Sequence, residues 1–198
     1  MALGEIKHNY YNQDFNKSKI LMQKYSNKEK IIKTVNKHPG LRFHEIKKQS
    51  KLANGTVEHH LNYLSKNEVF KIKYDGKVPR YYAYNLDDHT QVILLRLRQY
   101  TTAKIIKVLL KYDCQSFSQI VKFSKRSPGT VSVYKNMLLQ DKIIIGDTNE
   151  CPACMEKASK IKYRLTDPDR VKLLVEEYGK SQLKRCADNL ADVFLSLK

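Results

Sequence analysis

The chain has no tryptophan and only seven glycines, five prolines and four cysteines among its 198 residues. So few glycines leave little room for the loops that cradle phosphates, and neither the P-loop nor the dinucleotide-binding fingerprint is present. The zinc-deaminase and zincin patterns are missing as well. We therefore expect that the protein is not an enzyme.

Long hydrophobic runs are also missing. The longest, such as residues 92–95 and 143–145, are far too short to cross a bilayer. Glu5, Lys7 and His8 lie where a secretory signal needs an apolar core. The four cysteines are unevenly spaced and do not resemble a disulfide framework. We therefore expect them to be thiols in a reducing compartment. These absences predict a cytoplasmic protein without a membrane segment.

Acidic residues are the other scarce class. The chain has 20 Asp and Glu against 37 Lys and Arg, a net charge of +17 and a pI near 9.6. This excess predicts a polyanionic partner, with nucleic acid ahead of an acidic membrane surface. Double-stranded DNA is the expected partner and the nucleoid the expected location.

The sequence repeats itself. Lys30-Ile-Ile-Lys33 recurs as Lys104-Ile-Ile-Lys107, an offset of 74 (104 − 30). The same register holds without a gap, so we predict two copies of one small domain. Other matched pairs are Phe43 and Phe117, Ile46 and Ile120, Val57 and Val131, Asn62 and Asn136, and Leu64 and Leu138.

Each copy has the same order of predicted elements. In the first, a helix over residues 28–36 ends before a Pro-Gly pair, and a short helix follows over 43–50. A third helix is expected to begin at Gly55, and its counterpart at Pro128. Asn54 and Ser127 are the predicted N-caps. The β-prone runs 69–74 and 80–84 then predict a hairpin around Asp75-Gly76.

Helix, short helix, turn, helix and hairpin is the order of a winged helix-turn-helix. The pattern GTV-x-x-H-L-x-x-L over residues 55–64 resembles the ArsR/MarR-like transcriptional regulators, especially tandem archaeal forms. The resemblance implies a mainly α fold with small β-hairpin wings, in which two winged helix-turn-helix domains are joined by a helix and followed by a C-terminal helix. The predicted parts are an N-terminal helical arm (1–27), the first domain (28–86), a helical connector (87–100), the second domain with an extended wing (101–166) and the C-terminal helix (167–198).

Two adjacent histidines lie in the third helix of the first copy. Helical spacing places Val57, His60, Leu61 and Leu64 on the core side and His59 on the outer side. Adjacent residues point about 100° apart around a helix, and neither histidine has a second one four positions away. The pair therefore does not predict a metal site.

The outer face of this helix is expected to enter a major groove, and the basic hairpin tip to contact phosphates. A merely solvated face is the alternative. The candidates in the first copy are Asn54, Thr56, Glu58, His59, Asn62, Tyr63 and Lys66 on the helix and Lys71, Lys73, Lys77 and Arg80 on the wing. In the second copy they are Lys125, Arg126, Ser127, Thr130, Ser132 and Asn136.

The second copy departs from the first at Lys135, which replaces the core residue Leu61. A lysine there is costly unless its stem packs and its ammonium reaches water. Either the helix is rotated, or Met137 and Leu138 carry the packing. This copy is accordingly expected to contact DNA or, alternatively, to serve dimerisation or protein contact.

The long wing of the second copy carries Cys151 and Cys154 in a C-x-x-C pattern, the half-site of many zinc centres. A redox-responsive dithiol and a plain structural loop are the alternatives. Cys114 and Cys186 complete a metal site only if the fold or a dimer mate brings them near. Zinc is a candidate, and no cofactor is required.

Two helical stretches flank the second copy. Residues 88–112 contain no glycine or proline and predict one stiff continuous helix. The C-terminal segment opens at Asp167-Pro168 and carries an apolar stripe over residues 183–197 that is suited to a homodimer. The prediction is a sequence-specific DNA-binding transcription regulator. The alternatives are a protein-interaction subunit of the transcription machinery and a nucleoid architectural protein.

Overall fold

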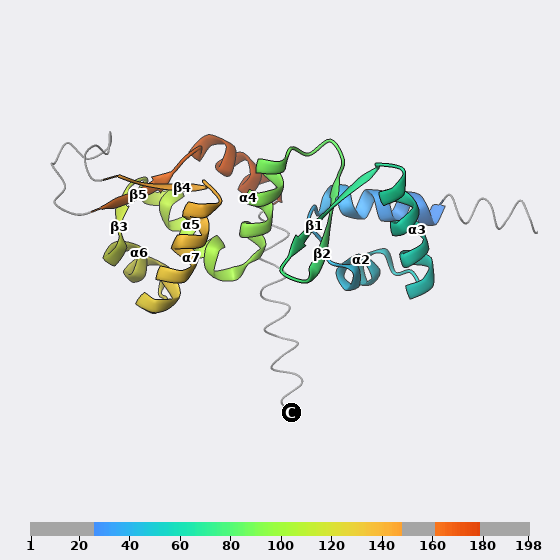
Figure 1. The fold of residues 1–198 in the computed structure, drawn as a ribbon, viewed down its shortest axis with the longest axis horizontal. Helices are drawn as coiled ribbons and strands as arrows, with labels where there is room; N and C mark the ends of the chain where they lie inside the picture. The colour runs from blue at the N-terminus through green and yellow to red at the C-terminus, as the bar shows by residue number, and fades with distance from the viewer. Residues whose placement is uncertain (1–25, 148–160, 179–198) are drawn as a thin grey trace, which may run out of the picture. The chain divides into compact units, whose positions relative to one another are not determined.

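The computed structural model describes residues 26–147 and 161–178, which form a mainly helical fold with two small antiparallel sheets (Figure 1). This composition is consistent with a winged helix-turn-helix. The chain divides into two compact units between Leu86 and Asp87. Within the described residues, no helix has the length and apolar character needed to cross a membrane.

The first unit contains a helix over residues 26–37, followed by two shorter helices and a hairpin. The helices are α2 (Phe43–Ser50) and α3 (Asn54–Lys66), and the strands are β1 (Phe70–Asp75) and β2 (Val78–Ala83). The strands pair antiparallel around Gly76, whose φ of +63° suits a glycine. The predictions of a short helix over 43–50 and of a hairpin are confirmed. The core comprises Ile31, Val35, Leu41, Ile46, Val57, Leu61, Leu64, Phe70 and Tyr81.

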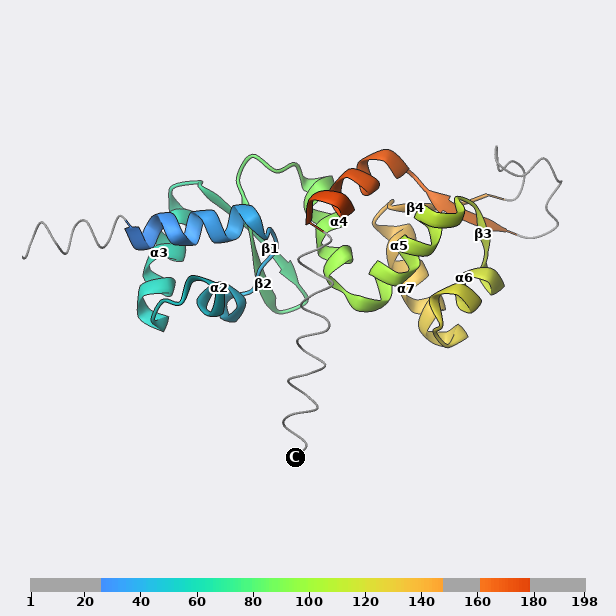
Figure 2. The ribbon, with the colours of Figure 1, turned by 180° about the vertical axis from the view of Figure 1, so that it is seen from behind.

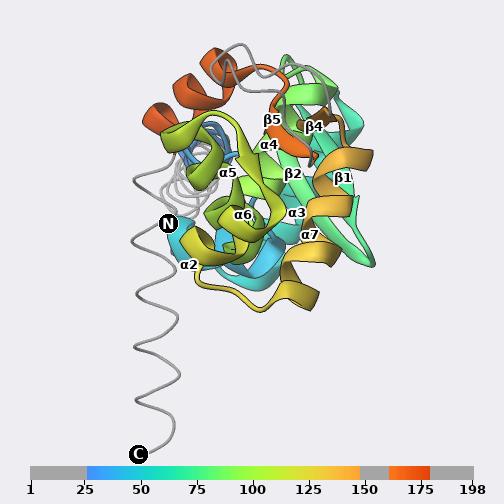
Figure 3. The ribbon, with the colours of Figure 1, turned by 90° about the vertical axis from the view of Figure 1, so that its left-hand side faces the viewer.

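The second unit begins with two helices and adds a three-stranded sheet. Its elements are α4 (Asp88–Arg98), α5 (Tyr100–Tyr112), β3 (Gln115–Ser116), α6 (Phe117–Ser124), α7 (Pro128–Gln140), β4 (Ile144–Asp147) and β5 (Lys162–Leu165), and a helix over 168–178 follows. The strand order is β3-β5-β4, and both pairings are antiparallel. Figures 2 and 3 show α5, α6 and α7 packed together in this unit. The strand β3 was not predicted.

The structural elements repeat at the same offset as the sequence. The helices α6 and α7 begin and end 74 residues after α2 and α3. Lys51 and Lys125 both adopt left-handed backbone angles in the turn between these helices, with φ of 56° and 53°. The isolated bridge from Leu41 to Tyr81 corresponds to the β3 to β5 pairing. The matched pairs that are buried in both copies include Ile31 and Ile105, Ile46 and Ile120, Val57 and Val131, and Leu64 and Leu138.

The prediction of one continuous helix from residue 88 to residue 112 is wrong. The backbone of Gln99 is extended (φ −86°, ψ 123°) and separates α4 from α5. The buried Thr102 hydroxyl donates to the Gln99 carbonyl at 3.0 Å and also to the Arg96 carbonyl. The Arg96 guanidinium in turn pairs with Asp141 at the end of α7. Side chains, rather than glycine or proline, therefore fix the break.

The predicted N-cap of α3 is displaced by one residue. Asn54 is the first helical residue, and Ala53, which has no side-chain oxygen, occupies the cap position. The counterpart Ser127 does cap α7, because its hydroxyl accepts from the Thr130 amide at 3.3 Å. The shared register sets the start of both helices, although only one copy retains a capping side chain.

The last described helix begins as predicted, because the Asp167 carboxylate accepts from the Arg170 amide at 3.0 Å. The C-terminal apolar stripe and most of the N-terminal arm lie outside the described residues. The homodimer therefore remains a prediction.

Asp87 links α4 to the last described helix and supports a pH prediction. Its carboxylate accepts from the Thr90 amide at 2.9 Å and the Thr90 hydroxyl at 2.7 Å, and it pairs with Arg170. The hydrogen bonds from Thr90, followed by the charge of Arg170, lower the pKa of Asp87 to about 2. Folding thus favours the charged carboxylate. Its contribution to stability is complete above about pH 4 and is lost as the pH falls toward 2.

We expect Asp87→Ala to lower the free energy of unfolding by about 1 kcal/mol at pH 7, the usual loss for an N-cap. Asp87→Asn keeps a capping oxygen without the charge and should lose less. Urea unfolding between pH 7 and the lowest pH at which the fold persists measures both variants. The difference between the wild type and Asp87→Asn should narrow below pH 4. A difference independent of pH would contradict the assigned role.

Candidate nucleic-acid interface

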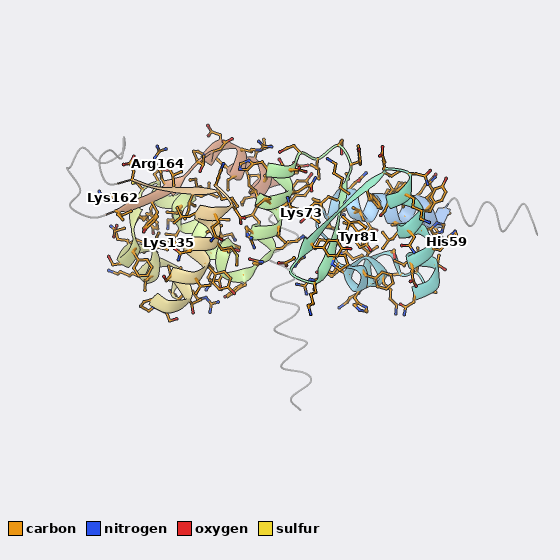
Figure 4. All side chains as sticks on the ribbon, viewed as in Figure 1. His59, Lys73, Tyr81, Lys135, Lys162 and Arg164 are labelled. Atoms are coloured by element: carbon orange, nitrogen blue, oxygen red, sulfur yellow. The ribbon has the colours of Figure 1, made fainter. Side chains whose placement is uncertain are left out.

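The helix α3 has an apolar face and a polar face. Val57, His60, Leu61 and Leu64 are buried, and His60 is only 4% exposed. His59 lies on the outer side, with its ring edge-on to that of His60 at 5.3 Å (Figure 4). The predicted division of the histidine pair is confirmed. The remaining outer candidates are Asn54, Glu58, Asn62, Tyr63 and Lys66, which are exposed, and Thr56, which is half-buried.

The first turn of α3 is open to approach from outside. A Cβ built at Gly55 would meet no atom within 4 Å, and the same is true of Gly129 in α7. Neither glycine has the positive φ that would require one. No side chain caps α3, so its first-turn amides have no capping acceptor in the described structure. Glycine at this position lets an external anion approach amides that point along the helix axis.

The hairpin carries three lysines, two along β1 and one in its turn. Lys71 and Lys73 are half-buried on β1, where Figure 4 labels Lys73, and Lys77 is exposed in the turn. The Lys71 ammonium lies 4.9 Å from the centre of the Tyr84 ring. Of the three, Lys77 is the most accessible to a partner outside the hairpin.

Arg80 differs from the other basic residues of the hairpin because only 4% of it is exposed. Its Nε and Nη2 donate to one Asp75 oxygen at 3.1 and 2.8 Å, and its Nη1 donates to the Gly40 carbonyl at 3.0 Å. The guanidinium is therefore engaged inside the unit. Arg80 supports the hairpin, and we leave it out of the set of proposed phosphate contacts.

Helix α3 packs next to β1 of the hairpin, and Tyr81 lies on the neighbouring strand β2. The pKa of Tyr81 is raised, mainly by burial of its phenol and to a smaller extent by the charges of Tyr74 and Glu58. The phenol thus stays protonated at neutral pH, and Glu58 of α3 lies near enough to β2 to act on it. We call the outer residues of both elements the α3–hairpin surface; they are Thr56, Glu58, His59, Asn62, Lys66, Lys71, Lys73 and Lys77.

The matching helix α7 offers fewer polar groups. The Ser127 hydroxyl lies 2.8 Å from that of Thr130 and accepts from its amide, so both side chains serve the helix start. Ser132 is half-buried and Asn136 is exposed. The counterpart of His59 is Val133, which is 61% exposed. The outer face of α7 thus carries an exposed apolar side chain where α3 carries His59.

Lys135 is accommodated in place, without rotation of α7. Val131 and Leu138 are buried as their counterparts in α3 are, so the helix keeps the same face inward. The Lys135 ammonium lies 3.1 Å from the Tyr163 hydroxyl, 4.8 Å from that ring and 5.8 Å from the Phe117 ring. Two aromatic rings therefore surround the cation and lower the cost of placing it there.

The basic residues before α7 face different surroundings. The Arg126 guanidinium lies over the Tyr100 ring at 4.5 Å, which holds it against α5. Lys125 is exposed and lines a hollow between α5 and α6. Sequence reasoning missed Lys162 and Arg164 on β5, which alternate with the buried Tyr163 and Leu165 (Figure 4). That alternation could have identified them.

Cys151 and Cys154 lie outside the described residues, as does Cys186. Cys114 is buried in the second unit. Among the residues with described positions, no group of three or more His, Cys, Asp or Glu side chains is arranged to hold a metal ion. A zinc or redox role for the cysteine pair remains a prediction.

Residues 25–94 match a protein family described as an N-terminal HTH domain, which identifies a helix-turn-helix in the first part of the chain. No curated protein matches the sequence. Among solved structures, one similar chain is Bordetella bronchiseptica BpsR, from work on how 6-hydroxynicotinic acid regulates its DNA binding. It is 19% identical, the match covers 70% of this chain and 94% of that chain, and the TM-score is 0.34. ScpB from Mycobacterium tuberculosis is 10% identical over 69% of this chain and 84% of that chain, with a TM-score of 0.27. Sequence identities and TM-scores this low do not bear on the function of this chain.

Proposed function

We propose that the protein is a transcription regulator that binds double-stranded DNA in a sequence-specific manner. The α3–hairpin surface is the observation that carries the proposal, because it lies within the segment that matches a helix-turn-helix family. Its helix offers hydrogen-bonding side chains at successive turns, and its hairpin supplies lysines beside them. Base contacts from the helix and phosphate contacts from the wing are the usual division of labour in this motif.

The two units are proposed to be tandem winged helix-turn-helix domains with different tasks. Support comes from the constant offset between α2 and α6, between α3 and α7, and between the buried residues of both. The first unit reads bases. The second unit supports binding through phosphate contacts of basic residues such as the half-buried Lys162 and Arg164, because α7 presents Val133 where α3 presents His59.

A protein-interaction role has less support than the sequence alone gave it. Lys135 on the core face of α7 favoured such a role, but the rings of Phe117 and Tyr163 give that lysine an internal one. The cysteine-bearing wing also favoured it, and Cys151 and Cys154 lie outside the described residues. An architectural DNA-coating protein shares the basic charge of this chain and differs in binding all sequences equally.

Selection of bound genomic fragments tests the proposal. We expect enrichment of a defined sequence at moderate salt, with an affinity that falls about a thousandfold between 50 and 200 mM salt, because lysine contacts release counterions from phosphates. Equal recovery of all fragments would favour the architectural alternative. Absence of bound DNA at moderate salt, with capture of polymerase or transcription factors instead, would favour the interaction subunit.

A further inference from the structure

A hollow of about 490 Å³ lies in the second unit between α5 and α6. These helices pack against each other (Figure 2). Five lysines line the hollow: Lys104, Lys107 and Lys111 follow one face of α5, and Lys122 and Lys125 surround the end of α6. Val108, Tyr112, Phe123 and Ser124 complete the wall, so no carboxylate lines it. None of these residues belongs to α7 or to the wing.

The concentration of positive charge is unfavourable without a counterion. Like charges a few ångströms apart repel, and the repulsion grows where a concave wall limits solvent. Two of the ammonium groups are partly compensated by rings, because Lys104 lies 4.8 Å from the Tyr100 centre and Lys111 lies 5.0 Å from the Tyr112 centre. A multiply charged anion in the hollow would relieve the remaining repulsion.

All five lysines recur in the first copy. Their counterparts are Lys30, Lys33, Lys37, Lys48 and Lys51. The two copies differ at Leu61 and Lys135 and at His59 and Val133, yet they agree at each of these charged positions. The lysines alone therefore do not distinguish the two copies.

The aromatic wall is specific to the second copy. Tyr112 and Phe123 stack at 4.6 Å with an interplanar angle of 23°, and each is more than a third exposed. Their counterparts in the first copy are His38 and Gln49. Lys111 lies over the Tyr112 ring, so the outer face of Phe123 is the platform offered to a planar base, next to cations suited to phosphates.

We propose that this hollow binds a nucleoside polyphosphate, with its phosphates on the lysines and its base against the Tyr112–Phe123 pair. The site is separate from the α3–hairpin surface, so it goes beyond the proposed DNA reading and can exist without it. It gives the second unit a ligand of its own.

Titration of the full chain with ATP and GTP at 0.1 M salt without divalent cations tests the assignment, with tripolyphosphate, adenosine and duplex DNA as comparison ligands. Calorimetry should show saturable nucleotide binding that is tighter than that of tripolyphosphate. Lys107→Gln with Lys111→Gln should weaken nucleotide binding by at least about tenfold. The matched control, Lys33→Gln with Lys37→Gln, should leave it unchanged.

Phe123→Ala separates the base from the phosphates. It should weaken nucleotide binding about fivefold or more and leave tripolyphosphate binding unchanged. Equal affinity for nucleotide and tripolyphosphate would overturn the assignment, because the hollow would then recognise charge alone. Absence of nucleotide binding would also overturn it. If Lys107→Gln with Lys111→Gln instead weakens only duplex DNA, the hollow belongs to the DNA interface and the nucleotide proposal fails.

Discussion

Replacing Arg80 with alanine will destabilise the first unit by about 3 kcal/mol, the usual cost of breaking a buried charged pair. The guanidinium connects two parts of the unit that lie far apart in sequence. It donates twice to Asp75 at the end of β1 and once to the carbonyl of Gly40, which precedes α2. Gly40 is also fixed by its own amide, which donates to the Tyr81 carbonyl at 2.8 Å. Loss of Arg80 leaves a carboxylate and a carbonyl without this donor, together with a cavity.

Two further variants distinguish charge from geometry. Arg80→Lys should recover only part of the loss, because one ammonium cannot reproduce the fork that reaches Asp75 and Gly40 together. Lys73→Ala is the matched control, since Lys73 faces Arg80 across the hairpin and carries a similar charge. It should change stability by no more than about 0.5 kcal/mol.

Hydrogen exchange at the amides of β1 and β2 is the appropriate measurement, because it reports on the first unit even when the second stays folded. Exchange should accelerate markedly in Arg80→Ala. If protection is retained while DNA affinity falls, Arg80 contacts a phosphate, as the sequence suggested, and the supporting role assigned from its burial is incorrect.

Arg80 also shows where the sequence stops being informative. The basic residues around Asp75-Gly76 predict one charged tip, and their sequence does not separate Arg80 from Lys77. The difference depends on Gly40, a residue of another segment whose carbonyl lies within reach only after folding. Charge patterns predict a basic wing, but they do not reveal which cation the fold uses internally.

Structural features could be predicted where local sequence signals agree with the packing. The bounds of α2, the hairpin and the burial of His60 follow from helical spacing and turn residues, and the structure bears them out. The break at Gln99 was not predictable, because it depends on Thr102 and on the contact between Arg96 and Asp141. Lys135 puts a charged residue at a position that the repeat predicts to be buried. The structure accommodates it through Tyr163 on β5, and the sequence does not show that this residue lies beside α7.

Replacing His59 and Asn62 together with alanine should weaken binding to the selected DNA sequence about a hundredfold, since each base contact contributes about 1–3 kcal/mol of discrimination. Both side chains are exposed on the outer face of α3, so the fold should be little affected. Binding to random DNA should barely change, because neither replacement removes a permanent cation. The specificity ratio, measured by competition at fixed salt, is therefore the informative quantity.

The wing gives the complementary control. Lys73→Gln with Lys77→Gln should weaken binding to selected and random DNA alike and reduce the salt slope by about 2, one counterion for each lost phosphate contact. Val133→Ala with Asn136→Ala makes the corresponding change in α7 and should leave specificity nearly intact. If the α7 variant loses specificity and the α3 variant does not, the second unit reads the bases. If neither loses it while both bind DNA, recognition does not depend on the helix faces, and the architectural alternative gains the stronger support.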